Sequence, residues 1–318
     1  MGGRGYLVTG GAGFIGSHVV EALLRRGERV AVIDNFSTGR RTNFEEVAGG
    51  RPAGVPAPEL FEGDIRDGAL VRRALKNVTH VLHQAALPSV QRSVEEPLPS
   101  HEVNATATLE LLLAARDAEV RRVVYASSSS AYGDTPTLPK VESMTPAPLS
   151  PYAVSKLAGE YYCRIVTGLY GLETVSLRYF NIFGPRQDPN SQYAAVIPNF
   201  VTAALAGRPP VIYGDGLQSR DFTYVENAVA ANLLACDAPA AAGGAYNVAC
   251  GTRVTLLDVI RLLSGIVGRP IAPTHEAPRA GDVKHSLASI EAARRDLGFE
   301  PGIGLEEGLR RTVAWFRK

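Results

Sequence analysis

Apolar residues follow two patterns along the first half of the chain: short continuous runs, and stretches in which they recur every three to four positions. The runs have the length of buried strands, and the recurring pattern is typical of helices that pack along one face. Strands are predicted over residues 5–9, 30–34, 60–64, 80–84, 122–127 and 174–179. Helices are predicted over residues 14–27, 67–76, 104–116 and 151–170. Continuous apolar strands separated by helices predict a parallel sheet that is covered on both faces.

The pattern becomes irregular after about Tyr179. There the sequence predicts helices over 199–206, 256–267, 287–297 and 305–317, a short strand over 211–213, and a strand–helix pair over 221–236. The predicted fold class is therefore α/β, a Rossmann-type doubly wound parallel sheet with a smaller mixed α/β C-terminal substrate domain. The first domain is expected to span 1–178, with later segments of about 222–250 returning to it. Residues 179–318 are expected to form mainly the second domain, and the cleft between the two is the expected site.

Charge and composition narrow the function. The chain has 33 basic and 32 acidic residues, so no basic surplus points to nucleic acid or to a membrane surface. No apolar stretch reaches the roughly 18 residues of a membrane span, and the N-terminus lacks the layout of a signal peptide. The three cysteines (163, 236 and 250) are widely spaced and have no metal-ligand spacing. We expect a cytoplasmic protein with neither a disulfide framework nor a bound metal.

A glycine-rich turn between the first strand and the first helix predicts a dinucleotide site. Gly10, Gly13 and Gly16 permit a tight turn, a close approach of backbone amides to a pyrophosphate, and close packing of the helix on the sheet. Asp34 ends the second strand, where a carboxylate accepts hydrogen bonds from both adenosine ribose hydroxyls and repels a 2′-phosphate. This arrangement favours NAD over NADP. Arg40 and Arg41 lie further along, and we expect them to be a solvated pair rather than to hold a 2′-phosphate.

A second group of residues predicts proton chemistry at the same edge of the sheet. A run of four serines, 127–130, ends the strand that begins at Arg122, and carboxyl ends of parallel strands are where such sheets place their sites. Tyr152 and Lys156 lie one helical turn apart on one face of the helix that Ser150 caps. An ammonium group near a phenol is expected to lower the pKa of the phenol from about 10 toward neutrality. The pair then forms a base that can deprotonate a sugar hydroxyl.

The motifs together resemble those of the extended short-chain dehydrogenase/reductase superfamily and, within it, the UDP-sugar 4-epimerases. The resemblance covers essentially the whole chain and rests on TGGAGFIGSH (9–18), DNFSTG (34–39), GDIRD (63–67), HQAALPSV (83–90), SSSSAYG (127–133), SPYAVSK (150–156), LRYFNIFGPRQDP (177–189), GDGLQSRDFTYV (214–225) and RAGDVKHS (279–286). The closest subgroup is that of bacterial epimerases acting on N-acetylated UDP-hexoses.

This resemblance implies that the chain holds NAD tightly and epimerises a UDP-hexose, UDP-GlcNAc/UDP-GalNAc or UDP-Glc/UDP-Gal or both, through a 4-keto intermediate. It assigns catalysis to Ser128, Tyr152 and Lys156. It assigns cofactor contacts to Gly10, Gly13, Phe14, Ile15, Gly16, Asp34, Asn35, Ser37, Thr38, Gly39, Asp64, Ile65, Gln84, Ala85, Ala86, Asn104, Ser127, Tyr152, Lys156, Tyr179 and Phe180. His83 is expected only to order its loop through a hydrogen bond. The family also implies a homodimer formed through the helices near 104–116 and 151–170.

The resemblance further assigns UDP-sugar contacts to Ser89, Ser128, Ser129, Tyr152, Asn181, Ala195, Val196, Phe200, Tyr213, Arg220, Arg279, Asp282 and Ser286. Arg220 and Arg279 would neutralise the diphosphate, and Asp282 would bind the uridine ribose. Ser286 stands where glucose/galactose epimerases carry a bulky Tyr, which would leave room for a 2-acetamido group. Pro88 replaces a small glycine often seen nearby, and it is expected to narrow the sugar pocket.

Four alternative functions fit the motifs less well. Sugar 4,6-dehydratases carry an acid–base pair where this chain has Ser129 and Ser130, and hydroxyls cannot replace that pair near neutral pH; decarboxylases carry a Glu in the same stretch. UDP-glucuronate 4-epimerases are expected to carry an Arg at position 188, and Asp188 would repel a uronate. A non-catalytic NAD-binding regulator is disfavoured because such proteins typically lose the Tyr/Lys pair.

Overall fold

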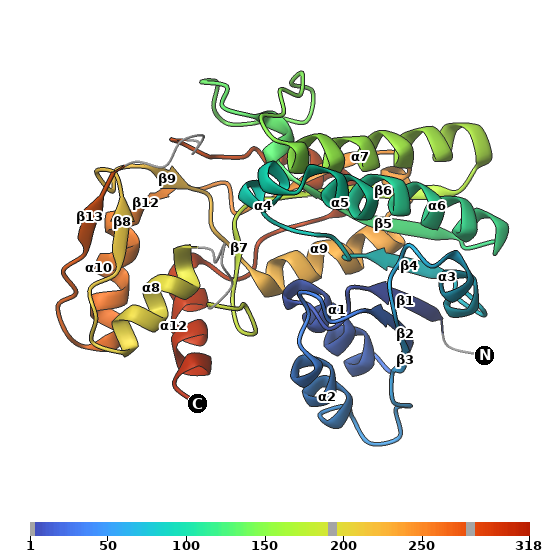
Figure 1. Cartoon of the computed structure of the whole chain (residues 1–318), viewed down its shortest axis with the longest axis horizontal. Coiled ribbons are helices and arrows are strands. Elements are labelled where there is room, and N and C mark those ends of the chain that lie inside the picture. Colours follow the sequence, from blue (N-terminus) through green and yellow to red (C-terminus); the bar gives the residue numbers. More distant parts are fainter. Residues whose placement is uncertain (1–3, 190–195, 278–283) are drawn as a thin grey trace.

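The computed structural model describes residues 4–189, 196–277 and 284–318. Its centre is a seven-stranded sheet in which every neighbouring pair is parallel (Figure 1). In spatial order the strands are β11 (Ala245–Val248), β6 (Glu173–Tyr179), β5 (Arg122–Ser128), β4 (His80–His83), β1 (Gly5–Thr9), β2 (Arg29–Asp34) and β3 (Glu59–Glu62). The order reverses between β1 and β4, which is the switch point where doubly wound sheets bind ligands.

Helices cover both faces of the sheet. One face packs against α1 (Phe14–Arg25), α2 (Arg41–Gly49), α9 (Val225–Asp237) and α11 (Glu291–Leu297). The other face packs against α3 (Gly68–Ala74), α6 (Ala107–Asp117) and α7 (Pro151–Tyr170), with α5 (Pro97–His101) and a π-helical turn (Glu102–Thr106) also against α7. The two apolar layers so formed are the main core of the protein, and the predicted doubly wound sheet is confirmed.

A smaller unit lies at one end of the sheet (Figure 1). Its core contains side chains from α8 (Val196–Leu205), α10 (Leu256–Val267) and α12 (Leu305–Phe316). Three two-stranded pairs accompany these helices: β7 (Ile182–Phe183) with β10 (Thr223–Tyr224), β9 (Ser219–Arg220) with β12 (Val254–Thr255), and β8 (Val211–Tyr213) with β13 (Thr274–Glu276). Short turns are formed by α4 (Val90–Glu95), η2 (Ser129–Tyr132) and η3 (Pro239–Ala241).

The chain crosses between the two units more than once. After β7 in the smaller unit, α9 and β11 return to the large sheet, where β11 pairs with β6. The last segments then place α11 on the sheet layer and α12 in the smaller unit. None of the helices in the described ranges is both long and apolar enough to cross a membrane.

Candidate active site

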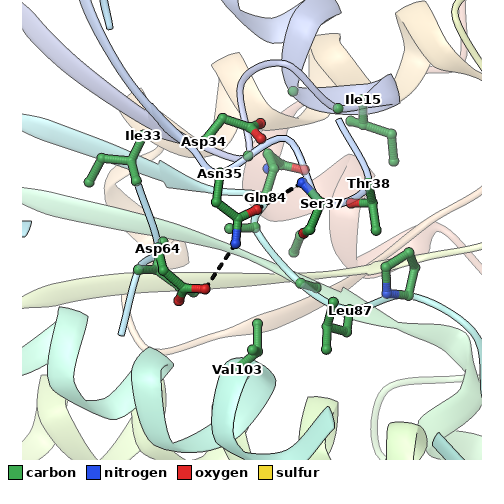
Figure 2. A pocket seen from close by; sticks show the side chains of 18 of the residues that line it. Ile15, Ile33, Asp34, Asn35, Ser37, Thr38, Asp64, Gln84, Leu87 and Val103 are labelled. Atoms are coloured by element: carbon green, nitrogen blue, oxygen red, sulfur yellow. Dashed lines mark hydrogen bonds between the residues drawn. The ribbon is translucent and has the colours of Figure 1, made fainter. Parts of the chain in front are cut away.

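A cavity of about 390 Å³ opens along the carboxyl ends of the sheet strands. Residues from the ends of β1, β2, β3, β4, β5 and β6 all contribute to its wall, because parallel strands end at the same edge of the sheet. Figure 2 shows Asp34, Asn35, Asp64 and Gln84 grouped around it. The glycine turn, the acidic strand end and the Tyr/Lys pair therefore line one continuous cavity.

The glycine turn has the shape that a phosphate-binding loop needs. Gly10 has φ +69°, and a Cβ on it would lie 2.8 Å from the backbone of Ala85. A Cβ on Gly16 would lie 2.0 Å from the carbonyl oxygen of Gly10. Gly13 precedes α1, and no side chain of the residues that the structure describes caps that helix. The N-terminal amides of α1 therefore face the cavity without a capping side chain, an arrangement that suits an anionic phosphate.

Asp34 is fixed at the end of β2. Its two carboxylate oxygens accept hydrogen bonds from the amides of Ala12 and Phe36, each at 2.8 Å. Burial raises the pKa of Asp34, and the two amides oppose that shift. A Cβ on Gly39 would lie 2.9 Å from Asp34 Oδ1, so the turn after β2 wraps closely around the carboxylate.

The neighbouring polar residues complete this end of the cavity. Asn35 Nδ2 donates to Asp64 Oδ2 at 2.9 Å, and Ser37 N donates to Asn35 Oδ1 at 3.0 Å (Figure 2). Hydrogen bonding from Arg66 lowers the pKa of Asp64. Together with the glycine turn, this rim of carboxylates and amides fits the adenosine and pyrophosphate groups of NAD.

Tyr152 and Lys156 line the opposite end of the cavity. The helix that bears them starts where predicted: Ala153 N donates to Ser150 Oγ at 3.2 Å, and Pro151 occupies the first helical position. Lys156 Nζ donates to the carbonyl oxygen of Ala126 at 2.9 Å and lies 5.1 Å from the centre of the Tyr125 ring. Lys156 is thereby tied to β5, just before the strand end that carries Ser128.

Burial has the largest effect on the pKa of both Tyr152 and Lys156. It lowers the pKa of Lys156 to about 7. It also raises the pKa of Tyr152, and a hydrogen bond with the Ser128 hydroxyl opposes the increase. The expectation that Lys156 lowers the pKa of Tyr152 toward neutrality is therefore wrong for the protein alone: both groups lose hydration, and the ammonium is directed to a backbone carbonyl.

The serines after β5 form a connected group of hydroxyls. Ser128 Oγ accepts hydrogen bonds from Ser130 N at 3.1 Å and from Ser130 Oγ at 2.8 Å. Ser129 lies between them at the start of the turn η2, and all three are partly exposed. The turn presents hydroxyls and no carboxylate next to Ser128.

Most of the predicted cofactor residues line the cavity, and three do not. Those that do are Gly10, Gly13, Phe14, Ile15, Gly16, Asp34, Asn35, Ser37, Thr38, Asp64, Ile65, Gln84, Ala85, Ala86, Ser127, Tyr152, Lys156 and Tyr179. Gly39 lies in the turn that wraps around the Asp34 carboxylate, and Phe180 is buried against Tyr132. Asn104 is also buried; it accepts from Leu87 N at 2.8 Å and donates to Leu87 O at 3.1 Å, so it shapes the loop after β4.

Several lining residues were not predicted. These are Ile33, Gly63, Arg66, Leu87, Arg92, Pro99, Val103 and Ala126. Arg66 lies inside the quoted GDIRD motif and could have been found there. Arg92, Pro99 and Val103 lie on α4, on α5 and in the π-helical turn, where the irregular spacing of apolar residues gives no clear helical pattern.

The predicted sugar contacts lie on several separate segments. Asn181, with φ +40°, donates from Nδ2 to the carbonyl oxygen of Asp221 at 3.1 Å. Arg220 Nη1 donates to the carbonyl oxygens of Ser219 and Lys284 at 3.1 Å each. Ser286 N donates to Ser219 O at 2.9 Å, so position 286 lies beside β9.

The remaining sugar contacts differ in their setting. Ser89, with φ +107°, precedes α4 and accepts a hydrogen bond from Arg92 N. Val196 begins α8 and Tyr213 ends β8. Phe200 is only 1% exposed within the core of the smaller unit, so it presents no face to a ligand there. Ala195, Arg279 and Asp282 lie outside the described residues.

The structure gives a partner to two charged residues. Arg40, expected to be solvated, keeps 41% of its side chain exposed and forms an ion pair with Asp188. The two side chains come from the turn after β2 and from the loop after β7, which the sequence could not place side by side. Because Arg40 compensates its charge, Asp188 is a weaker argument against a uronate than its position in the sequence indicated.

Among the described residues, His, Cys, Asp and Glu side chains form no group of three or more that could hold a metal ion. His83 Nδ1 lies 2.6 Å from Thr9 Oγ1, and its Nε2 lies 2.9 Å from Thr108 Oγ1. Burial lowers the pKa of His83 to about 3. The imidazole is thus a buried, neutral link between β4, β1 and α6.

Comparisons with known proteins agree with this geometry. Residues 6–249 match the model of the NAD dependent epimerase/dehydratase family. A UDP-N-acetylglucosamine 4-epimerase structure from Methanobrevibacter ruminantium M1, in complex with UDP-N-acetylmuramic acid, is 42% identical, with a TM-score of 0.93 over 100% of this chain and 99% of that chain. The UDP-glucose 4-epimerase of Thermus thermophilus, in complex with NAD, is 41% identical, with a TM-score of 0.86 over 99% of each chain. UDP-glucuronate 4-epimerase 3 of Arabidopsis thaliana is 32% identical over 98% of this chain and 77% of its own length.

Proposed function

We propose, from the premise that this chain belongs to the NAD dependent epimerase/dehydratase family, that it interconverts the 4-epimers of a UDP-hexose. The family is NAD dependent, which confirms the predicted cofactor. One observation carries the proposal: Tyr152 and Lys156 line the same cavity as the glycine turn, and Ser128 ends the strand to which Lys156 is tied.

Three residues have separate roles in the proposed reaction. Tyr152 removes the proton from the sugar 4-hydroxyl, which requires its phenolate. Burial disfavours the phenolate in the protein alone, and the positive charges of Lys156 and of an oxidised nicotinamide would favour it. Ser128 shares the proton through its hydrogen bond with Tyr152. Burial lowers the pKa of Lys156 to about 7, so this residue of the cavity wall can exchange a proton near neutral pH. The glycine turn and Asp34 would hold NAD, which would supply the hydride acceptor and donor for C4 of the sugar. Tyr152 then reprotonates the 4-oxygen, which completes the epimerisation.

The turn η2 argues against the related dehydration reaction. Elimination of a 6-hydroxyl needs a general acid and a general base beside the oxidised sugar. Ser129 and Ser130 offer only hydroxyls, and the latter is hydrogen bonded to Ser128. The turn η2 therefore offers the oxidised sugar no partner for elimination, which leaves reduction back to a hydroxyl as the proposed outcome.

A neutral hexose, plain or N-acetylated, is the proposed substrate. Support comes from Ser286, whose small side chain adjoins β9 next to Arg220, and from the likeness to a UDP-N-acetylglucosamine 4-epimerase. A uronate is the second candidate. It is favoured by the compensation of Asp188 by Arg40 and by the likeness to a glucuronate epimerase.

Proton NMR of the purified protein with UDP-Glc, UDP-GlcNAc and UDP-glucuronate, each without added NAD, tests both candidates. Conversion of a neutral hexose to its 4-epimer supports the proposal and shows that the protein retains NAD. Conversion of UDP-glucuronate alone would replace the neutral hexose by the uronate. No conversion of any substrate by protein that contains NAD would refute the epimerase assignment.

We propose a homodimer whose contact surface lies on α7 alone, rather than on both helices that the family implies. On α6, Leu111 and Leu112 are fully buried, so these two side chains belong to the core and not to a dimer surface. On α7, Tyr161, Ile165 and Leu169 are 47%, 50% and 70% exposed at helical spacing. We expect Ile165→Glu to shift the mass measured by light scattering from dimer to monomer, and a monomeric wild-type protein would contradict this.

A further inference from the structure

A buried ion pair lies behind the catalytic strand end. Arg178 in β6 donates from Nε to Glu160 Oε2 of α7 at 2.9 Å, and its Nη2 pairs with the other carboxylate oxygen. The two side chains are only 4% and 7% exposed. Since burying two charges costs hydration that their attraction barely repays, stability alone is a weak reason for placing such a pair here.

The ion pair holds both ends of the segment that contains Ser128. At one end, Ser127 Oγ donates to Glu160 Oε2 at 3.0 Å. At the other end, Tyr132 OH accepts from Arg178 Nη1 at 2.8 Å. Ser128 and the turn η2 lie between these two anchors, so the position of the Ser128 hydroxyl depends on both of them.

The same pair also fixes the catalytic face of α7. Glu160 lies one helical turn beyond Lys156 and two turns beyond Tyr152, so all three side chains share one face of the helix. The contacts from Glu160 to Arg178 and Ser127 press that face onto β5 and β6. One carboxylate thus sets the position of Tyr152 relative to Ser128.

The network continues toward the segment that bears Ser286. Tyr132 OH donates to Asn247 Oδ1 at 2.7 Å. Asn247 Nδ2 in turn donates to the carbonyl oxygens of Lys140 and Ser289 at 3.1 and 3.0 Å. Lys140 and Ser289 are also joined through their backbones, at 2.9 Å. The network therefore links the catalytic serine to the start of the last structural segment.

We propose that Glu160, Arg178 and Tyr132 are positioning residues that hold the Ser128 hydroxyl against Tyr152 and in register with the segment around Ser286. The inference rests on the proposed epimerase function. None of the three residues has to touch the substrate; each acts through the groups that it holds. Misplacement of a reacting group by about 1 Å can cost on the order of 10²-fold in rate.

The chain offers a matched control on the same two strands. Arg122 begins β5 and pairs with Glu173 at the start of β6, with Nε to Oε2 at 2.9 Å. Its side chain is 1% exposed. It lies at the amino ends of the strands, opposite the cavity, so its replacement affects stability without touching the catalytic end.

The test compares Tyr132→Phe, Arg178→Lys and Arg122→Lys. For each variant, kcat is measured per bound NAD over a pH series, beside KM and a thermal unfolding curve. Tyr132→Phe keeps the ring that packs on Phe180 and removes only the hydroxyl. We expect Tyr132→Phe and Arg178→Lys to lower kcat by about 10- to 100-fold with smaller changes in KM. The acidic limb of the kcat profile should move to higher pH as Tyr152 loses its bond with Ser128.

Arg122→Lys is expected to lower the unfolding temperature and leave kcat and its pH profile unchanged. The inference is overturned if Tyr132→Phe keeps the wild-type kcat and profile, or if Arg122→Lys loses as much kcat as the other variants. Should Arg178→Lys fail to fold, Tyr132→Phe decides the question. A wild-type protein that epimerises no UDP-sugar would instead refute the proposed function, so the two failures are distinguishable.

Discussion

Buried His83 makes the stability of the protein depend on pH in a calculable way. Its imidazole lies between Thr9 and Thr108, and burial, aided by the charge of Lys156, lowers its pKa from 6.5 to about 3. A histidine whose pKa falls on folding stabilises the native state above its unfolded pKa. That stabilisation is lost as the pH falls from 6.5 toward 3.

The size of the effect follows from the two pKa values. Relative to neutral pH, the His83 contribution at pH 5 falls by about 2 kcal/mol, and by about 5 kcal/mol once the pH is below both values. The perturbation is His83→Gln, which removes the titrating ring and keeps a polar side chain between the threonines. The variant lacks the imidazole whose pKa changes on folding. Its free energy of unfolding should therefore fall about 2 kcal/mol less than that of the wild type between pH 7 and pH 5.

Urea unfolding at pH 7 and pH 5, at one protein concentration, measures this double difference. It does not depend on how much the substitution costs at neutral pH. His101→Gln, at an exposed position on α5, is the matched control and should leave the pH dependence unchanged. An equal loss of stability in wild type and His83→Gln between the two pH values would refute the claim that His83 is neutral in the fold.

Three further changes test the site and the fold. Tyr152→Phe should lower kcat by about 10²–10⁴-fold without loss of bound NAD. Turnover is measured by NMR, and bound NAD by the absorbance of the cofactor released on denaturation. Unchanged turnover per NAD-loaded site would contradict the role of Tyr152 as the base. Asp34→Ala should weaken NAD binding by about 10- to 100-fold and reduce the difference in affinity between NAD and NADP. Calorimetry of the cofactor-free protein with each dinucleotide measures both affinities. An unchanged preference for NAD would show that Asp34 does not determine it. Arg122→Met should lower the free energy of unfolding by about 3–5 kcal/mol, because Glu173 and the carbonyls of Ala235 and Ala238 lose their hydrogen-bond donor. A change below about 1 kcal/mol would show that water takes over the hydrogen bonds of the guanidinium.

The regular part of the fold could be predicted from the sequence because it depends on local patterns. Strand β1 and helix α7 have the predicted bounds, since each has one clear apolar period and distinct end signals. The predicted helix over 104–116 begins instead with a π-helical turn, and α2, α4 and α5 were not predicted. These segments are short and lack a sustained apolar period, so nothing local distinguishes them from loops.

The site was predictable where a motif names its residues and unpredictable where it depends on contacts across the chain. Tyr152 and Lys156 were found from their spacing, but the direction of the Tyr152 pKa shift depends on how deeply the fold buries it. The pairing of Arg40 with Asp188 joins two loops far apart in sequence. Glu160 and Arg178 belong to no motif or spacing that sets them apart from other charges, because the sequence holds no sign that they meet in the core.

The break in strand order between β1 and β4 also divides the cavity by sequence. Strands β1, β2 and β3 lead into the glycine turn, Asp34 and Asp64, which are predicted to bind the cofactor, whereas β5 and α7 carry Ser128, Tyr152 and Lys156, to which the proposed proton chemistry is assigned. Most of the proposed dinucleotide site and the proposed bond chemistry therefore lie in separate stretches of the sequence. Substitutions in the turn after β5 can redirect the reaction while the first stretch stays constant, so this architecture is modular and open to diversification, in nature or in the laboratory, one half at a time.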